Sequence, residues 1–307
     1  MDFCFPDNPQ GSITEFKKQE TPMILIRKRS IGQAHEEVIR EIAKRCEGNV
    51  RVTEDGEYTW DPEEPICIHV EEPFSEPMRS GASLFGEKFS EQYQASLYTI
   101  TPRRNDGTDA VYTYGNRLRD YPRALVKISE NSSGKKKGIL QGLFRKMGYV
   151  PADSCGALNF SGDGNYGGYD QIQESIINRL VANQESRRAI AITWFPEKDI
   201  SADEPPCLQI VQGVVDKNHK LNLICLFRSN DMLSAWGQNA YGLAHLQKYI
   251  CEQINQKRKK EEVELSSGWL ETISISAHMY FHRDQLELNL FLEKIKTGEL
   301  FSSFQKR

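Results

Sequence analysis

Apolar positions recur along this chain with two different periods. Spacings of three and four residues, the period of a helix, predict helices over residues 32–46, 86–98, 171–181 and 239–254. Short runs rich in β-branched residues predict strands over residues 23–30, 188–195, 208–215, 221–228 and 269–281. Two long amphipathic helices among several strands indicate a layered domain of the α/β or α+β class.

The pattern also divides the chain into an arm, a body and an insertion. Residues 1–21 are polar and contain prolines, so we expect an N-terminal arm ahead of a single domain over 22–307. Alternation around Asp55-Gly56 predicts a hairpin. The stretch 122–169 has several glycines and no long period, so we expect an insertion there, with Lys135–Lys137 in a solvated loop.

Composition narrows the class of protein. The 307 residues are 38% hydrophobic and 27% charged, which is typical of a globular domain. A net charge of −4 provides no general field for holding nucleic acid. We find no run of eighteen apolar residues and no apolar segment after Met1, so we expect neither a membrane span nor a secretory signal.

Cysteine and histidine usage points to a reducing compartment. The seven cysteines are odd in number and lack C-x-x-C pairs, which argues against a disulfide framework and a zinc site. The six histidines also lack the spacing of metal ligands. We therefore expect a cytoplasmic protein without a metal.

One glycine motif suggests a dinucleotide site but lacks its context. Gly162, Gly164 and Gly167 form G-x-G-x-x-G in "SGDGNYGG". The motif lies inside the irregular insertion, and no parallel βαβ array surrounds it. A glycine-rich loop is the better interpretation.

A cysteine with an unusual local context stands at the start of a predicted strand. Pro205 and Pro206 precede Cys207 in "DEPPCLQIVQG", and they restrict the chain to extended conformations. A free cysteine is most often a small buried hydrophobe. The alternative is that the prolines present a reactive sulfur at a fixed place.

Basic and polar residues near Cys207 in the sequence would suit a reactive sulfur. Arg187 and Arg188 at a helix-to-strand junction could grip a phosphate, or simply be solvated. Arg228 and Ser229 follow a predicted strand, where they could bind an anion. Arginine can also lower the pKa of a neighbouring cysteine.

Three further polar positions follow. Asn239, eight residues after Asp231, carries an amide that suits the edge of a pyrimidine, although a residue opening a helix could equally be an N-cap. His278 and Tyr280 lie two apart on one face of a strand and could bind a sugar hydroxyl, or form a core pair.

Taken together, these segments resemble the thymidylate synthases and the related pyrimidine-nucleotide hydroxymethylases. The similarity runs through "SRRAIAITW", "PPCLQ", "RSNDMLSAWGQNAYGL" and "AHMYFHRD", over residues 169–284, and extends back to "VYTYGNRLRDYP". The "PPCLQ" and "RSND" forms are similar to the archaeal-type branch. The resemblance implies a mixed β-sheet flanked by helices, with the sheet packed at a homodimer interface.

The resemblance also implies chemistry. Cys207 would add to C6 of a pyrimidine nucleoside monophosphate, so that C5 attacks the one-carbon unit of 5,10-methylenetetrahydrofolate. Tyr114 would help abstract the C5 proton. Glu76 would shuttle protons, with Glu71 and Glu72 as candidates nearby. Asp231 would support the base.

The remaining family positions would bind the nucleotide. Arg228 and Ser229 would hold its 5′-phosphate, together with Arg187 and Arg188 from the second subunit. Residues His278 and Tyr280 would bind the 3′-hydroxyl, and Asn239 would read O4 and N3 of uracil. A carboxylate in place of that amide would favour cytosine, so the substrate we predict is dUMP.

Two departures from the family pattern bear on the product. Leu208 follows the nucleophile where many members have a histidine, and the C-terminal "ELFSSFQKR" does not resemble the apolar cap over folate. A site open to water would yield a hydroxymethyl product from dUMP, dCMP or CMP instead of dTMP. The sequence is also compatible with a non-catalytic nucleotide- or RNA-binding protein on the same fold, and with an unrelated cysteine enzyme.

Overall fold

The computed structural model describes residues 23–46, 50–81, 83, 85–101, 112–121, 169–259 and 261–297. Its strands are β1 (Ile24–Lys28), β2 (Arg51–Val52), β3 (Tyr58–Thr59), β4 (Ile66–Val70), β5 (Ile190–Ile192), β6 (Leu208–Val215), β7 (Lys220–Asp231) and β8 (Ser266–His278). Its helices are α1 (Ile31–Cys46), α2 (Glu87–Tyr98), α3 (Tyr114–Arg119), α5 (Asn178–Ala182), α6 (Pro196–Asp199), α7 (Trp236–Lys257), α8 (Gln285–Thr297) and the π-helix η1 (Ile172–Ile177).

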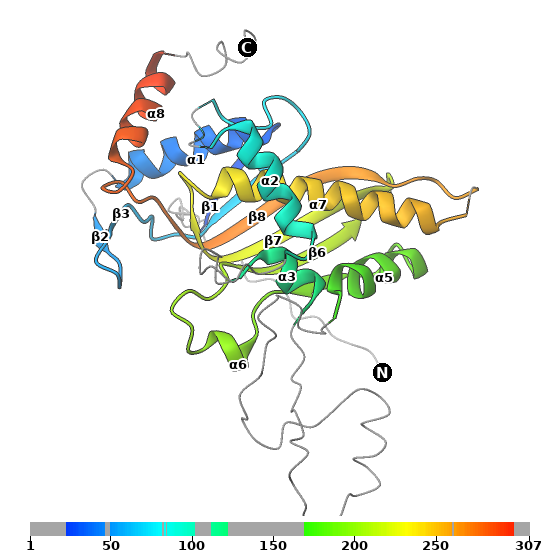
Figure 1. Cartoon of the computed structure of the whole chain (residues 1–307). Coiled ribbons are helices and arrows are strands. Elements are labelled where there is room, and N and C mark those ends of the chain that lie inside the picture. Colours follow the sequence, from blue (N-terminus) through cyan, green and yellow to red (C-terminus); the bar gives the residue numbers. More distant parts are fainter. Residues whose placement is uncertain are drawn as a thin grey trace, which may run out of the picture.

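Six strands form one mixed sheet in the order β1-β4-β8-β7-β6-β5 (Figure 1). The pairs β1/β4 and β7/β8 are parallel, whereas β4/β8, β5/β6 and β6/β7 are antiparallel. Strands β2 and β3 form a separate hairpin, whose turn contains Gly56 at φ +80°. The expected mixed sheet flanked by helices, of the α+β class, is confirmed.

The apolar stripes of the long helices pack onto one face of this sheet. Helix α7 contacts β7 and β8 and also touches α1, α2 and η1. Its predicted stripe is fully buried at Leu243, Leu246, Ile250 and Ile254. Burial of such a stripe, rather than intrinsic propensity, is what stabilises an amphipathic helix of this kind.

The opposite face of the sheet has no helix stripe against it among the described elements. Strand register aligns one apolar row across all six strands, and it consists of Leu25, Cys67, Ile273, Leu226, Ile210 and Ile192. The row is open at its two ends, since Leu25 is 70% and Ile192 is 39% exposed. A sheet with one covered face and one open apolar face normally packs against another layer.

The structure departs from the sequence predictions in several places. The helix predicted over 171–181 begins as a π-helix, and β7 continues through Asp231 rather than ending at 228. Strand β4 and helix α8 were not predicted. The expected arm, the G-x-G-x-x-G motif and residues 122–168 of the insertion predicted over 122–169 lie outside the described residues.

Within the described part of the chain, no helix has the length and apolar character that a membrane crossing requires.

Candidate active site

The segment that carries Cys207 is held against β7 by hydrogen bonds from Arg228 to the carbonyls of Pro205 and Pro206. The Arg228 side chain donates from Nε to the Pro206 carbonyl at 3.1 Å and from Nη2 to the Pro205 carbonyl at 2.6 Å. The backbone N–H of Arg228 donates to the Cys207 carbonyl at 2.9 Å. The rigid "PPC" segment therefore holds a half-buried sulfur at a fixed position.

Two opposing effects set the charge of this sulfur. Burial has the larger effect and leaves the pKa of the Cys207 thiol above its ordinary value, although the Arg228 guanidinium and a hydrogen bond from Tyr112 lower it. Arg228 Nη2 lies 3.8 Å from Sγ. A thiolate formed here would gain the Arg228 guanidinium as a charge-assisted partner, which offsets part of the cost of burying its charge.

Arg228 and Ser229 are both partly accessible near the end of β7. Along β7, burial alternates through Cys225 and Phe227, then shifts so that Asn230 is the next buried residue. Regular alternation would send neighbouring side chains to opposite faces. Arg228 and Ser229 are both half-buried, so each has a part of its side chain open to a ligand.

A wall of tyrosines faces the cysteine. The Tyr112 hydroxyl accepts from the Cys207 N–H and the Tyr114 hydroxyl accepts from the Leu208 N–H, each at 3.3 Å. Burial raises the pKa of Tyr112 to about 12 and that of Tyr114 well above its ordinary value. Both groups therefore stay protonated at neutral pH, and each keeps a proton to donate.

Helix α3 holds Tyr114 in this wall. Thr113 Oγ1 accepts the N–H of Asn116 at 3.1 Å and so caps the helix at the tyrosine. The Asn116 side chain in turn bonds both backbone groups of Thr101. A Cβ on Gly115 would lie 2.1 Å from the Thr99 carbonyl, so only glycine permits this close approach of α3 to α2.

Asn239 lies in the first turn of α7, not at its cap as one interpretation expected. The helix begins at Trp236, and the Asp231 carboxylate closes the preceding turn by accepting the N–H groups of Leu233 and Ser234. The N-cap interpretation of Asn239 is therefore wrong. Its buried amide instead bonds the hydroxyl of Tyr93 at 2.5 Å.

Four tyrosine hydroxyls are coupled electrostatically to the Cys207 sulfur. Burial is the main cause that raises their pKa values, and a negative charge on Cys207 contributes to the increase for Tyr93, Tyr112, Tyr114 and Tyr280. These tyrosines come from α2, the start of α3 and the segment after β8. Three parts of the chain thus lie within electrostatic reach of one sulfur.

His278 and Tyr280 come together at the end of β8. Their rings meet edge to face, with centroids 5.0 Å apart, and both side chains are half-buried. Arg283 lies over the Tyr280 ring at 4.1 Å and pairs with Asp231 at 3.0 Å. The ring pair is thereby anchored to the turn before α7.

Three predicted site residues lie apart from this cluster. Arg187 and Arg188 are exposed in the loop before β5, and Glu76 is exposed with a carboxylate that accepts the N–H of Met78 at 3.1 Å. The nearby carboxylates Glu71 and Glu72 form exposed ion pairs with arginines. The structure thus brings together the cysteine, the strand-end pair, the amide and the His–Tyr pair.

Sequence reasoning missed two residues of the cluster, Tyr93 and Tyr112. Tyr112 precedes Tyr114 by two positions in "VYTYG", so period-2 spacing alone could have suggested it. Tyr93 stands on α2, 146 residues before its partner Asn239. That contact arises only from the packing of α2 on α7.

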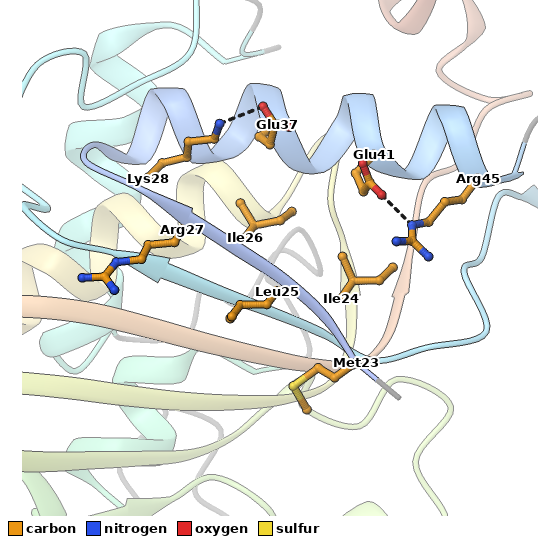
Figure 2. Close-up of a pocket in the computed structure, with 9 residues that line it drawn as sticks. All are labelled: Met23, Ile24, Leu25, Ile26, Arg27, Lys28, Glu37, Glu41 and Arg45. Atoms are coloured by element: carbon orange, nitrogen blue, oxygen red, sulfur yellow. Dashed lines mark hydrogen bonds and ion pairs between the residues drawn. The ribbon is translucent and has the colours of Figure 1, made fainter. Parts of the chain in front are cut away.

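A separate hollow of about 400 Å³ lies between β1 and α1 (Figure 2). Within its charged lining, Lys28 pairs with Glu37 at 3.0 Å and Arg45 with Glu41 at 2.6 Å, whereas Arg27 pairs with Glu71 outside it. It contains none of the predicted site residues. The cluster around Cys207 is therefore the candidate active site.

Comparisons with known proteins identify a family. The family model described as thymidylate synthase matches residues 10–296. A protein of Methanocaldococcus jannaschii named "Putative thymidylate synthase" is 31% identical over 267 residues, which cover 85% of this chain and 93% of the relative.

Two relatives of the same name match over shorter stretches. The one from Methanococcoides burtonii is 27% identical over 71% of this chain and 72% of its own length. The one from Methanosarcina barkeri is 38% identical over 38% of this chain, and the match spans about half (49%) of that relative. With the family model covering most of the sequence and a relative matched over nearly its whole length, this chain belongs to the thymidylate synthase family.

Proposed function

We propose that the protein is a C5 one-carbon transferase that makes dTMP from dUMP with 5,10-methylenetetrahydrofolate. The observation that carries the proposal is the clamped Cys207, with the Arg228 guanidinium against its sulfur and tyrosine hydroxyls around it. A merely structural cysteine needs neither a cationic partner nor a rigid support.

The chain supplies the groups for a balanced covalent step. The Cys207 thiol first loses its proton, and the thiolate forms a bond to C6 while the C5–C6 electron pair moves toward C5 and O4. After C5 has taken up the one-carbon unit, the C5 proton leaves and its electron pair would release that unit from the folate nitrogen. A hydride that the folate would supply then converts the resulting methylene into a methyl group, and the displaced electron pair expels the Cys207 thiolate. Arg228 stabilises the sulfur anion at the start and at the end of this sequence.

Tyr114 is suited to pass the C5 proton onward. Its hydroxyl oxygen is oriented by the Leu208 N–H, and its high pKa means that it returns to the neutral form after each transfer. In our proposal Glu76 is the glutamate that receives protons. Because Glu76 is exposed, it would act through water or after the preceding loop has moved over the bound substrate.

The nucleotide would lie between the strand-end residues and α7. Arg228 and Ser229 would hold the 5′-phosphate, and the His278–Tyr280 pair would bind the 3′-hydroxyl. Asn239 would face the base. The carboxylate of Asp231 is already engaged by the turn, so we infer that it supports the base by fixing the start of α7.

A homodimer would complete the phosphate site. The apolar row across the open sheet face provides a surface for a second copy, and β5 at its edge presents Ile190 and Ile192 at 38% and 39% exposure. Arg187 and Arg188 stand immediately before that strand and are themselves exposed. Docking of two such faces would carry both arginines toward the partner's site.

The folate would occupy the side of α2 that faces Asn239. Phe85 and Phe89 stack at 4.3 Å between centroids, and Phe89 stacks in turn on Tyr93 at 6.0 Å. Phe89 is 42% exposed, so a flat heteroaromatic ring can extend the stack. These two phenylalanines would hold the folate, which supplies the one-carbon unit and the reducing hydride.

The reducing cytosol suits this chemistry, because the proposed nucleophile must remain a free thiol. Cys207 and the other described cysteines, at positions 46, 67, 225 and 251, are all free. We therefore propose a cytoplasmic enzyme.

Product masses test the proposal. The purified protein is incubated with 5,10-methylenetetrahydrofolate and, separately, with dUMP, dCMP, UMP and CMP. We expect methylated dUMP together with dihydrofolate. A product heavier by one further oxygen would identify a hydroxymethylase, whereas nucleotide binding without any product would leave the fold as a binding protein.

A further inference from the structure

The buried amide of Asn239 has only part of its hydrogen-bonding capacity satisfied within the described part of the chain. An asparagine side chain offers two acceptor sites on oxygen and two N–H donors. Here Oδ1 accepts from the Tyr93 hydroxyl at 2.5 Å and Nδ2 donates to Asn230 Oδ1 at 3.3 Å. One acceptor site and one donor remain, which is the pair that a pyrimidine edge requires.

This amide belongs to a chain of directed hydrogen bonds. Asn230 continues the chain in the same donor-to-acceptor direction, because its Nδ2 donates to Ser274 Oγ at 3.2 Å. Both ends of the chain are hydroxyls, Tyr93 at one end and Ser274 at the other. A hydroxyl can donate or accept, so the direction of the whole chain depends on which role its ends adopt.

The direction of the chain decides which base the amide can read. Uracil presents an acceptor at O4 and a donor at N3, whereas cytosine presents a donor at N4 and an acceptor at N3. A half-turn of the Asn239 amide exchanges its oxygen and nitrogen and therefore exchanges the preferred base. A lone asparagine could turn freely, so its identity alone does not specify uracil.

We propose that Tyr93 is a specificity-determining positioning residue, which fixes the orientation of the Asn239 amide by donating its hydroxyl proton to Oδ1. This inference rests on the proposed function, since it assigns base selection at the same site. The Asn230–Ser274 pair completes the orientation from the other side, by accepting the Asn239 N–H.

The surroundings of Tyr93 hold the hydroxyl in its donor role. The ring stacks on Phe89, which fixes its direction on α2. Burial raises the pKa of Tyr93, so that the proton stays on the oxygen over the working range of an enzyme. The 2.5 Å contact has the length of an O–H···O bond and is short for an N–H···O bond, so the hydroxyl donates to Oδ1 and disfavours the turned amide, whose N–H groups would face it.

The test measures the dissociation constants of dUMP and dCMP by calorimetry, so that it does not depend on turnover. The Tyr93→Phe variant keeps the ring and removes the donor. We expect the ratio of the two constants to move toward one by about five- to tenfold, the value of one hydrogen bond. Tyr98→Phe is the matched control on the same helix, because Tyr98 stacks on Tyr249, and it should leave the ratio unchanged.

A second variant tests the direction of the chain. Asn230→Asp places a group that only accepts opposite Asn239 Nδ2, while the Ser274 hydroxyl can turn to donate. In the Tyr93→Phe background, this change should restore the preference of the wild type. A simple packing defect at Tyr93 would not be rescued in this way.

Each outcome bears on the proposal. An unchanged ratio in Tyr93→Phe, with both nucleotides still bound, would overturn it while leaving the proposed function intact. Equal loss of affinity for both nucleotides would also overturn it. If the wild type binds neither nucleotide, the proposed function fails and the inference fails with it. A ratio that shifts in Tyr93→Phe and returns in the double variant supports it.

Discussion

Two arginines lie close to the candidate site and differ in how their charge is satisfied. Arg117 is 1% exposed and forms a two-pronged ion pair with the fully buried Asp199, at 2.7 and 3.0 Å. Arg228 is half-buried, and its side chain is held by two proline carbonyls and lies against the Cys207 sulfur. One guanidinium is held by a carboxylate, and the other is held by neutral groups.

The difference separates a structural arginine from a binding one. A buried guanidinium with a paired carboxylate has its charge cancelled within the chain, so it has nothing left to offer a ligand. A half-buried guanidinium held by carbonyls keeps its full positive charge and its orientation. The second arrangement is ready for a phosphate or a thiolate, and it stands beside the cysteine whose proline context is unusual.

The largest effect is expected for a substitution of Cys207, whose sulfur lies against Arg228. Cys207→Ala removes the proposed nucleophile and should lower kcat by at least about 10⁴-fold. The free energy of unfolding should change by no more than about 1 kcal/mol, because the side chain is small and half-buried. Turnover assays and urea melts of the same preparation measure both quantities. Retained turnover would remove Cys207 from the mechanism.

Breaking the buried ion pair between Arg117 and Asp199 should affect stability rather than turnover. Asp199→Ala leaves the Arg117 charge buried and unpaired, so the free energy of unfolding should fall by about 3–5 kcal/mol. Urea unfolding followed by circular dichroism measures the loss. Glu41→Ala is the control, since its pair with Arg45 is half-exposed and should contribute about 0.5 kcal/mol or less. Equal losses in the two variants would refute the structural assignment of Arg117.

Neighbouring residues on α1 extend the comparison to buried groups without a compensating pair. Burial lowers the pKa of His35 to about 4, and burial raises that of Glu36 to about 7. The contribution of His35 to the free energy of unfolding falls as the pH falls from about 6.5 toward 4. The contribution of Glu36 falls as the pH rises from about 4.5 toward 7. The two dependences oppose each other between about pH 4.5 and 6.5.

Removing either titrating group should reveal the pH dependence that the other contributes to the free energy of unfolding. In Glu36→Gln, the free energy of unfolding should rise with pH between about 4 and 6.5, by about 3 kcal/mol. In His35→Gln, it should fall between about pH 4.5 and 7. Urea melts across this range measure both slopes. Two variants with the same sign of slope would contradict the assignment of opposite shifts.

The smallest effect is expected for a conservative change of Arg228, the half-buried arginine beside Cys207. Arg228→Lys keeps the charge but loses the forked donors, so KM for dUMP should rise about 10- to 100-fold. Its unfolding midpoint should stay near that of the wild type. Steady-state kinetics and a thermal melt suffice. A drop in stability comparable to that of Asp199→Ala would show that Arg228 is structural as well.

The strands and long helices of the C-terminal half could be predicted because their signal is local. The stripe of Leu243, Leu246 and Ile250 and the apolar run of β7 carry their own periodicity. The position of Asn239 could not be predicted, because the turn before α7 is closed by the Asp231 carboxylate rather than by a cap at the helix start.

The tyrosine wall shows the limit of the sequence more clearly. Cys207 can be recognised from its neighbours in the chain, the two prolines. Tyr93 has no such signal, because its partner Asn239 lies on another helix and the contact depends on tertiary packing. The partial exposure of both Arg228 and Ser229 likewise has no signal in the sequence, since each residue alone fits an ordinary strand end.

Release of tritium from dUMP labelled at C5 tests the central claim most directly. Addition of Cys207 to C6 must precede loss of the C5 proton, whether the product carries a methyl or a hydroxymethyl group. With 5,10-methylenetetrahydrofolate present, we predict that the wild type releases tritium to water and that folded Cys207→Ala releases none. Release by Cys207→Ala at the rate of the wild type, or none by the wild type, would contradict the account.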